Sequence, residues 1–432
     1  MRRIKIDKRP NATRLVQSQG LVYSYEPSSE GGDDPYWPDN RYYSFTSDEI
    51  ALLETAGQDV FAMCCEAADY LVAHPDTITD KMAIPAFCLQ QIARSWVREP
   101  AWGSVYGRFD FYEFNADTPT SLVEAATIQW QWLEQTGHGR DQFNSLTERL
   151  VAAWRRNLTL IEAEALGGGG IGRSRDNGRF YDHKGRHIDV CFKLYPWEWM
   201  VEQPFGAACF RDMEHVGDCD GDVLLLPPGG GNAYTGGTML WSNKGLFAVL
   251  WQLFKDDPRS RWLLPTYFEA EAPASLTRYA RKPLLAREGA DVTLHLDGQY
   301  GKEGYVRQEL AVLPAFRDDD EAGLPKGEEE EEEEERDGQD GGASPTTYYP
   351  VLGLWFVDGE PAGMGIREDT RKITANGSCF IPHSISDGET TYERKPVPTA
   401  AEIETLLTLE NYPDLKNNSH GVLDYIEGIV RE

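Results

Sequence analysis

The densest group of polar residues in the sequence lies just before a predicted helix. Its members are Arg108, Asp110, Glu113, Asn115 and Asp117. Glu113 and Asn115 are two apart on a predicted strand, so they share one face and stand roughly 7 Å apart along the chain. Their oxygen atoms suit one or two hard cations, and magnesium fits this donor set. An ordinary strand end with helix-capping residues explains the same five residues equally well.

Three basic fragments further along the chain could bind phosphate. They are residues 242–244 (Ser-Asn-Lys), 280–289 and 363–368. A lysine meets a phosphate as a point charge, whereas an arginine offers a planar fork of N–H groups. Isolated basic residues more often face solvent. Taken together, the three fragments resemble the parts of an ATP site that has no P-loop.

Two glycine clusters do not supply such a loop. Residues 167–172 match GxGxxG, but no helix pattern follows them, so a dinucleotide site is not expected. Residues 227–237 contain no Gly-Lys-Ser/Thr, so they form no phosphate-binding P-loop.

Local patterns predict the elements that must position the polar cluster. Thr46 and Glu49 form a capping box, after which apolar residues recur at helical spacing. Residues 103–115 favour one continuous strand. Thr118-Pro119 then favour a helix that runs to about Thr136 and stops at Gly137. This helix would aim its first backbone N–H groups at the polar cluster.

The C-terminal half is predicted to be rich in antiparallel strands. Residues 292–296, 305–313 and 348–357 alternate as strands do, and the last turns at Asp358-Gly359 into 362–367. Eight consecutive glutamates within residues 317–346 predict a disordered acidic insert between strands, because such a composition cannot bury a core.

The composition excludes several classes of protein. The 432 residues carry a formal net charge of −29, which argues against generic binding to nucleic acid or to anionic lipid membranes. Seven cysteines show neither a CxxC pair nor the Cys/His spacing of a zinc site, which indicates free thiols in a reducing compartment. No apolar segment has the length of a signal peptide core or of a membrane span, so we expect a cytoplasmic protein.

Several motifs, in their order along the chain, resemble a known family. They are Tyr-Gly-Arg-Phe-Asp at 106–110, Tyr-Glu-Phe-Asn-Ala-Asp-Thr-Pro-Thr at 112–120, Phe-Lys-Leu-Tyr-Pro-Trp-Glu-Trp at 192–199, and shorter matches at 242–244, 281–289, 300–304, 363–368 and 380–383. Over most of its length the chain resembles the glutathionylspermidine synthase family of ATP-grasp ligases. The amidase domain of the bifunctional members has no counterpart, so amide hydrolysis is not expected.

The resemblance implies an α+β or α/β protein with an ATP-grasp fold after a pre-ATP-grasp-like region. Residues 1–44 are rich in Tyr, Pro, Gly and Asp, and this composition predicts an extended arm rather than a domain. The rest is expected to divide into a substrate and metal region at 45–210 and a nucleotide-binding region at 211–432 that contains the acidic insert. The implied activity is an ATP- and magnesium-dependent carboxylate–amine ligase that works through an acyl phosphate. The expected substrates are a glutathione-like peptide carboxylate and a polyamine-like amine.

The resemblance also implies residue roles around the phosphates. Asp110, Glu113 and Asn115 would hold two Mg²⁺ ions. Lys244 and Lys282 would contact the ATP phosphates. The loop over the phosphates would contain Arg287, Glu288 and Gly289.

Further roles concern the adenine, the transferring phosphoryl group and the peptide. The adenine pocket would be lined by Gln308, Glu309, Leu310 and Ala311, with Arg371, Lys372 and Ile373 close by. Arg108 and Arg367 would stand at the transferring phosphoryl group as catalytic residues. Thr118 and Glu198 would lie near the peptide substrate.

Two departures from the family pattern leave another interpretation open. Only two residues separate Asp110 from Glu113, where the family has a hairpin, and on one continuous strand these carboxylates would point to opposite faces. Asp117 could then be a substitute ligand. Residues 167–182 replace most of the segment that relatives use for the amine. The alternative is a catalytically impaired pseudoenzyme that binds nucleotide or regulates, and missing exons would leave the same gaps.

Overall fold

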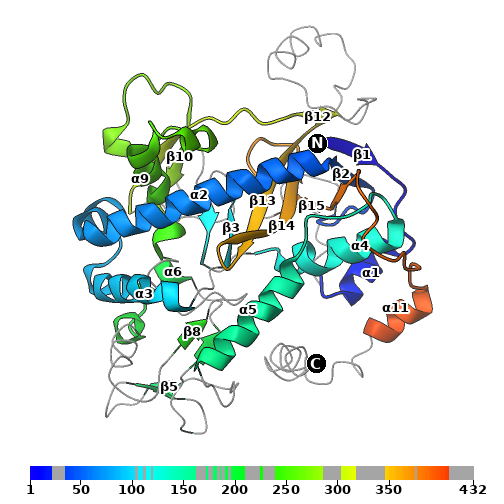
Figure 1. Cartoon of the computed structure of the whole chain (residues 1–432), viewed down its shortest axis with the longest axis horizontal. Coiled ribbons are helices and arrows are strands. Elements are labelled where there is room, and N and C mark those ends of the chain that lie inside the picture. The colour runs from blue at the N-terminus through cyan, green and yellow to red at the C-terminus, as the bar shows by residue number, and fades with distance from the viewer. Residues whose placement is uncertain are drawn as a thin grey trace.

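The computed structural model describes residues 1–21, 35–102, 106–109, 113–117, 120–161, 172–173, 179–181, 185, 190–192, 196–209, 224–226, 239–285, 303–317, 346–374 and 377–407. Helices and strands are mixed along the described chain, and several helices pack around a central sheet (Figure 1). The expected mixture of helix and sheet, of the α+β kind, is confirmed.

The largest sheet has the strand order β15-β14-β13-β3-β4, and β12 also pairs with β13. Its strands are β3 (Tyr106–Phe109), β4 (Phe114–Asn115), β12 (Phe316–Arg317), β13 (Thr347–Val357), β14 (Glu360–Asp369) and β15 (Cys379–Ile381). β13 turns into β14 at Asp358 and Gly359, whose φ angles of 56° and 77° are the left-handed values that an Asp-Gly hairpin turn needs. The hairpin predicted at these two residues is confirmed.

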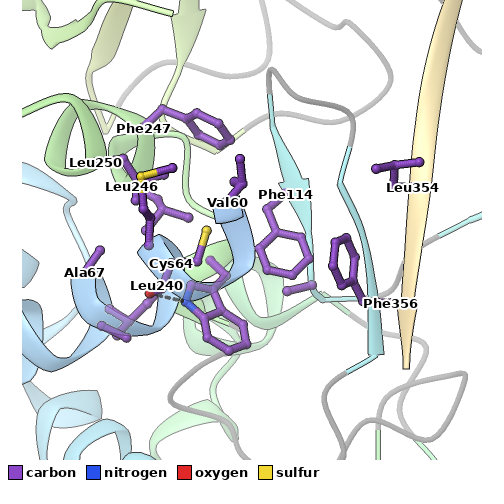
Figure 2. Packing of buried hydrophobic residues seen from close by; sticks show 14 of the residues in the cluster. Val60, Cys64, Ala67, Phe114, Leu240, Leu246, Phe247, Leu250, Leu354 and Phe356 are labelled. Carbon is purple, nitrogen blue, oxygen red and sulfur yellow. Dashed lines mark hydrogen bonds between the residues drawn. The ribbon is translucent and has the colours of Figure 1, made fainter. Parts of the chain in front are cut away.

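Helices cover both faces of this sheet. They are α2 (Ser47–Ala73) on one face and α4 (Gln129–Thr136) and α5 (Leu146–Ile161) on the other. Phe114, Leu354 and Phe356 point toward α2 and belong to the same hydrophobic cluster as its buried residues (Figure 2). Trp355, the next residue after Leu354, packs against α4 and α5 because side chains alternate along a strand. The predicted capping box at Thr46 begins α2.

The polar cluster near residue 110 lies on two strands rather than the one continuous strand expected. β3 and β4 are antiparallel, with Arg108 opposite Asn115 and Phe109 opposite Phe114, so the chain reverses between the two phenylalanines. The expectation was wrong because aromatic and β-branched content predicts extended backbone without marking a short reversal. Asp110 lies outside the described residues, and Glu113 directly precedes β4.

The helix expected from Thr118-Pro119 begins later in the chain. Leu122 is its first helical residue, and a π-helical turn η3 (Glu124–Ile128) leads into α4. Ser121 has a left-handed φ of 73°, which is incompatible with a helix that includes it. Gly137 ends α4 with a φ of 69°, as predicted.

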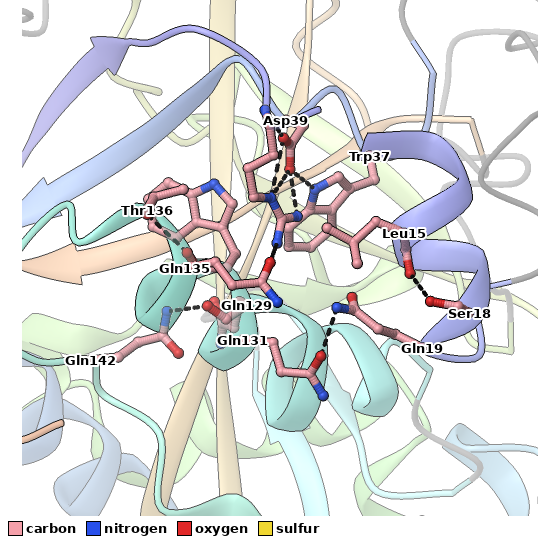
Figure 3. Close-up of polar contacts among 12 residues, drawn as sticks. Leu15, Ser18, Gln19, Trp37, Asp39, Gln129, Gln131, Gln135, Thr136 and Gln142 are labelled. Carbon is pink, nitrogen blue, oxygen red and sulfur yellow. Dashed lines mark hydrogen bonds and ion pairs between the residues drawn. The ribbon is translucent and has the colours of Figure 1, made fainter. Parts of the chain in front are cut away.

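Residues 1–44 do not form an extended arm in the part that the structure describes. β1 (Arg2–Lys5) pairs with β2 (Arg41–Phe45), which pairs in parallel with β16 (His383–Ile385), and helix α1 (Ala12–Ser18) lies between β1 and β2 in the chain. Arg9 donates hydrogen bonds to Asp39 and Gln135, which fastens this segment to α4 (Figure 3). Local composition could not predict these contacts because all of them are long-range.

A buried ion cluster fastens the same segment to the central sheet. Glu368 of β14 is 1% exposed and accepts hydrogen bonds from Arg3 at 2.7 Å, Arg41 at 2.7 Å and the Tyr43 hydroxyl at 2.6 Å. The guanidinium carbon of Arg3 stands 3.9 Å from the ring centroid of Tyr348. Each charge in the cluster depends on the others because an uncompensated buried charge is strongly destabilising.

The remaining elements flank the central sheet. The other strands are β5 (Gly172–Arg173), β6 (Phe180–Tyr181), β7 (Val190–Phe192), β8 (Leu224–Leu226), β9 (Thr266–Phe268), β10 (Tyr279–Pro283) and β11 (Tyr305–Glu309). β10, β11 and β9 form a second three-stranded sheet, in that order. The other helices are α3 (Leu89–Trp102), α6 (Trp197–Glu202), α9 (Gly245–Phe254) and α11 (Ala400–Leu407), with short turns η1 (Thr77–Lys81), η2 (Ala86–Cys88), η4 (Pro258–Trp262) and η5 (Glu269–Glu271).

The two strands that flank the acidic insert are neighbours in one sheet. Phe316 lies opposite Tyr348 and Arg317 opposite Thr347, so the insert connects paired strands. Residues 318–345 themselves, and the strand expected at 292–296, lie outside the described residues.

Two expectations from composition can be compared with the described residues. Five cysteines there are free thiols, as expected: Cys64, Cys65, Cys88, Cys209 and Cys379. None of the described helices is both long and apolar enough to cross a membrane.

We expect Glu368→Gln to lower the free energy of unfolding by about 3 to 5 kcal/mol, because it leaves two buried arginines without their negative partner. Glu404→Gln is the matched control. Its carboxylate pairs with Arg14 at the surface, where the two side chains are 59% and 47% exposed, and its loss should cost less than about 1 kcal/mol. Urea unfolding followed by circular dichroism compares the two variants, and equal losses would contradict the account of the buried cluster.

Candidate functional site

Side chains from four separate segments converge beside β4. Glu113 Oε2 lies 3.1 Å from Lys244 Nζ, and Asn115 Nδ2 donates to Glu113 Oε1 over 3.1 Å. Lys282 Nζ on β10 donates to Gln308 Oε1 on β11 at 2.8 Å. The charge of Lys282 also acts on Glu113. The structure thus brings together one carboxylate and two lysines that the sequence analysis assigned to a single site.

Glu113 is held in its charged form. Burial among protein atoms raises the pKa of its carboxyl group, but the charges of Lys244 and Lys282 and the hydrogen bonds from Lys244 and Asn115 lower it further, to about 2. The Glu113 side chain remains 28% exposed, whereas that of Lys244 is only 5% exposed. At neutral pH the site therefore presents an ionised carboxylate with a buried cation against it.

Lys244 is placed by its neighbours in the chain. Asn243 is buried and donates from Nδ2 to the carbonyl of Met82 at 2.8 Å, while its Oδ1 accepts from the Gly245 N–H at 2.8 Å. The Lys244 N–H donates to the carbonyl of Leu284, just after β10. A Cβ on Gly245 would meet Asn243 Oδ1 at 2.9 Å, so glycine allows this tight approach. These contacts fix the start of α9 beside the end of β10.

Ser242 joins the lysine segment to the end of β4. Its hydroxyl oxygen accepts from the backbone N–H groups of Ala116 at 3.1 Å and Asp117 at 2.7 Å. Asp117 is fully buried, and its Oδ2 accepts from the N–H of Trp197 at the start of α6. The structure therefore shows Asp117 holding the first turn of α6, which carries the half-buried Glu198.

Two of the residues assigned to adenine, Gln308 and Glu309, lie on β11 of the second three-stranded sheet, and Leu310 follows directly. Gln308 of β11 is 2% exposed and donates from Nε2 to Thr266 Oγ1 of β9 at 3.1 Å, so its amide is oriented from both sides. Glu309 ends β11 and is exposed. Leu310 and Ile373 are 44% and 39% exposed, which makes them apolar surface of the kind that a flat aromatic base can cover.

Arg367 and the residues after it occupy the end of β14. Arg367 donates from Nε and Nη2 to the carbonyl of Ser378, at 3.0 and 2.7 Å. Arg371 pairs with Asp369 at the surface, and the Lys372 ammonium stands 5.7 Å from the ring centroid of Tyr349.

The strand register separates the two arginines assigned to the phosphoryl group. Arg108 lies opposite Trp355, which lies opposite Gly363, four residues before Arg367 on β14. At the usual strand rise the offset along the sheet is roughly 13 Å, so the backbone positions of these arginines are not adjacent.

Several assigned residues lie outside the described part of the chain. They are Asp110, Thr118, Arg287, Glu288 and Gly289, together with the side chain of Arg108. Within the described residues, no three His, Cys, Asp or Glu side chains gather as a metal site. The magnesium ligands of this chain therefore stay a prediction.

The residues that hold these groups in place carry little signal in the sequence. Thr266 and Tyr36, whose ring centroid lies 5.0 Å from the guanidinium carbon of Arg367, belong to no motif, and Ser242 belongs only to Ser-Asn-Lys. A serine directly before a candidate phosphate-binding lysine was the available signal. His383 is buried, and burial lowers the pKa of its imidazole to about 3.

A family model and a related protein each match most of the chain. The model of the family described as "Glutathionylspermidine synthase preATP-grasp" matches residues 3–167, 161–325 and 333–386. A protein of Haemophilus influenzae that is named as an acid–amine ligase is 30% identical over 434 residues, covering 87% of this chain and 97% of its own length.

Two longer relatives match more distantly. The bifunctional glutathionylspermidine synthetase/amidase of Escherichia coli is 26% identical over 71% of this chain and 56% of its own length. The trypanothione synthetase of Crithidia fasciculata is 24% identical over 69% of this chain and 49% of its own length. The chain thus spans about half of each of these two proteins.

Replacing Ser242 by alanine should destabilise the junction between β4 and α9. The two N–H groups of Ala116 and Asp117 would lose their acceptor, which costs about 1 to 3 kcal/mol in the free energy of unfolding when the groups are shielded from water. Ser260→Ala is the control, because the Ser260 hydroxyl makes one exposed bond to the carbonyl of Lys255. Urea denaturation measures the free energy of unfolding of both variants. A loss in Ser242→Ala no larger than that in Ser260→Ala would contradict the stabilising role of Ser242.

Stability should depend on pH through Glu113. Its pKa is about 2 in the folded chain against an ordinary 4.5, so the unfolded chain binds more protons between these values. The stabilisation is complete above pH 4.5 and is lost as the pH falls toward 2. Glu113→Gln should remove at most about 3 kcal/mol of this dependence. Urea unfolding at a series of acidic pH values tests this, and parallel curves for the two proteins would contradict it.

Proposed function

We infer the function from one premise: this chain belongs to the glutathionylspermidine synthase preATP-grasp family. Its relatives carry the names of ligases and synthetases, which relates the chain to amide-forming ligases. We propose that it joins a carboxylate to an amine at the expense of ATP, with an ATP-grasp fold after a pre-ATP-grasp region. In this reaction the carboxylate oxygen attacks the γ-phosphorus, ADP leaves, and the amine nitrogen then displaces phosphate from the acyl phosphate.

One observation supports this proposal most strongly. The ionised carboxylate of Glu113 lies 3.1 Å from Lys244 Nζ, and the charge of Lys282 also acts on it, although the two lysines come from segments far apart in the sequence. Phosphoryl transfer needs positioned cations and hard oxygen ligands more than covalent chemistry, and this group contains both. A purely structural ion pair would need only one cation, whereas here the charge of the half-buried Lys282 acts on the same carboxylate as Lys244.

The donor set fits magnesium. The Glu113 carboxylate, with a pKa of about 2, is ionised at neutral pH and lies beside an amide side chain. Together they offer the hard oxygen atoms that Mg²⁺ prefers. We propose that Glu113 and Asn115, with Asp110, hold two Mg²⁺ ions. When bound, the metal would neutralise charge on the phosphates and orient them.

The chain's own cations would do the remaining work at the phosphates. Lys244 and Lys282 are proposed to bind the phosphate oxygens as point charges, with the loop of Arg287, Glu288 and Gly289 above them. Arg367 and Arg108 are proposed to stabilise the charge that develops on the transferring phosphoryl group.

Other segments of the chain would contact the adenine and the two substrates. Gln308 to Ala311 and Arg371 to Ile373 are proposed to line the adenine, where Leu310 and Ile373 supply exposed apolar surface. Thr118 and Glu198 are proposed to face a glutathione-like peptide, whose partner would be a polyamine-like amine. The names of the two longer relatives support these substrate classes.

The proposed division into regions at 1–44, 45–210 and 211–432 concerns the chain order rather than separate sheets. β3, before residue 210, pairs with β13, after it, and β4 pairs with β3. The metal and nucleotide residues can therefore meet because one sheet takes strands from both regions.

Turnover tests the proposal through Arg367. The assay follows the release of phosphate from ATP, in the presence of Mg²⁺, when glutathione and spermidine are added. The kcat of this reaction should fall by about a hundredfold in Arg367→Ala, because the transition state loses a fixed cation. Lys255→Met, which removes an exposed lysine after α9, is the control and should leave the rate unchanged.

Calorimetric titration with ATP and Mg²⁺ separates the alternatives. Nucleotide binding without phosphate release would favour the nucleotide-binding pseudoenzyme. Absence of binding would refute both interpretations. A wild-type rate in Arg367→Ala would remove this arginine from the mechanism.

A further inference from the structure

The guanidinium of Arg367 is held by a residue from the N-terminal segment. Its carbon stands 5.0 Å from the ring centroid of Tyr36, while its Nε and Nη2 donate to the carbonyl of Ser378. A guanidinium over an aromatic ring at this distance is attracted to the ring face. The ring and the carbonyl therefore fix the guanidinium from two directions.

Tyr36 is itself immobilised. Its side chain is 7% exposed, and its hydroxyl donates to Glu124 Oε1 at 2.8 Å and lies 3.3 Å from Ser121 Oγ. Its backbone carbonyl accepts from the N–H of Phe380 at 2.7 Å. Phe380 lies opposite Arg367 in the pairing of β14 with β15, so the Tyr36 backbone is registered to the strand beside the arginine.

The opposite face of β14 is fastened by the same N-terminal segment. Glu368 follows Arg367 and points to the other face, where Arg3 and Arg41 bind its carboxylate. Both faces of the strand end that carries Arg367 are therefore in contact with residues 1–45. Neither contact is needed to complete the sheet hydrogen bonds of β14.

We propose that Tyr36 is a positioning residue for Arg367, so that the N-terminal segment forms part of the catalytic apparatus. The inference rests on the proposed function of Arg367 at the phosphoryl group. The Tyr36 ring limits the orientations of the guanidinium, and its hydroxyl bond to Glu124 fixes the ring. A cation that is already oriented does not have to reorganise when charge develops in the transition state.

The ring and the hydroxyl of Tyr36 have separable roles. Tyr36→Phe keeps the ring beneath the guanidinium and removes the bond to Glu124. Tyr36→Leu removes the ring as well. Tyr42→Leu is the matched control, because Tyr42 is similarly buried, and its ring contacts Trp132 and His138 rather than Arg367.

Steady-state kinetics give the first readout. Tyr36→Leu should lower kcat by about tenfold and leave the KM for ATP unchanged, because the ring acts on the orientation of the cation and not on nucleotide affinity. Tyr36→Phe should restore most of the loss, and Tyr42→Leu should leave kcat unchanged. If Arg367→Ala is inactive while Tyr36→Leu behaves as Tyr42→Leu does, the positioning role is refuted and the proposed function stands.

Nuclear magnetic resonance gives a readout that does not need turnover. The Nε–H signal of Arg367, identified by its disappearance in Arg367→Lys, should shift and exchange faster with water in Tyr36→Leu than in Tyr36→Phe. An unchanged signal in Tyr36→Leu would overturn the inference. If the wild-type chain shows no turnover, the proposed function fails and this signal alone decides whether Tyr36 holds the arginine.

Discussion

The proposed site depends on the negative charge of Glu113, on which the charges of Lys244 and Lys282 both act. The three residues come from distant segments, and Lys244 is almost wholly buried, so the carboxylate 3.1 Å away compensates its buried charge. The same arrangement keeps the carboxylate ionised and available as a hard ligand. It also explains why the start of α9 is bonded so closely to its surroundings, through Asn243 and Ser242.

The central sheet positions the residues of the proposed site. β4 carries Asn115 at one edge, directly after Glu113, and β14 carries Arg367 beyond β13, so strands from both halves of the sequence hold the proposed machinery. The N-terminal residues then lock β14 from both faces, through Tyr36 and through the ion cluster around Glu368. A segment with an unremarkable composition therefore contributes to the stiffness of the site.

Local signals in the sequence predicted only part of this structure. The capping box at Thr46 and the Asp358-Gly359 hairpin were predictable because each is fixed by a few neighbouring residues. The short reversal between Phe109 and Phe114 and the left-handed Ser121 were not, because residue composition does not mark them. The pairing of the N-terminal strands was not predictable because it depends on partners far along the chain. Within the site, motif order and the family resemblance assigned Glu113 and Lys244 to one site, and the structure brings these two side chains together. The buried Asp117, considered as a substitute metal ligand, accepts from the N–H of Trp197, a contact that no motif marked.

Counting bound Mn²⁺ in place of Mg²⁺ tests the central claim most directly. Electron paramagnetic resonance of the chain with ATP should show two bound ions, and Glu113→Gln should lose metal binding while Glu404→Gln, which alters an exposed carboxylate, should not. Unchanged Mn²⁺ binding in Glu113→Gln would contradict the account, because the Glu113 carboxylate would then have no part in binding metal.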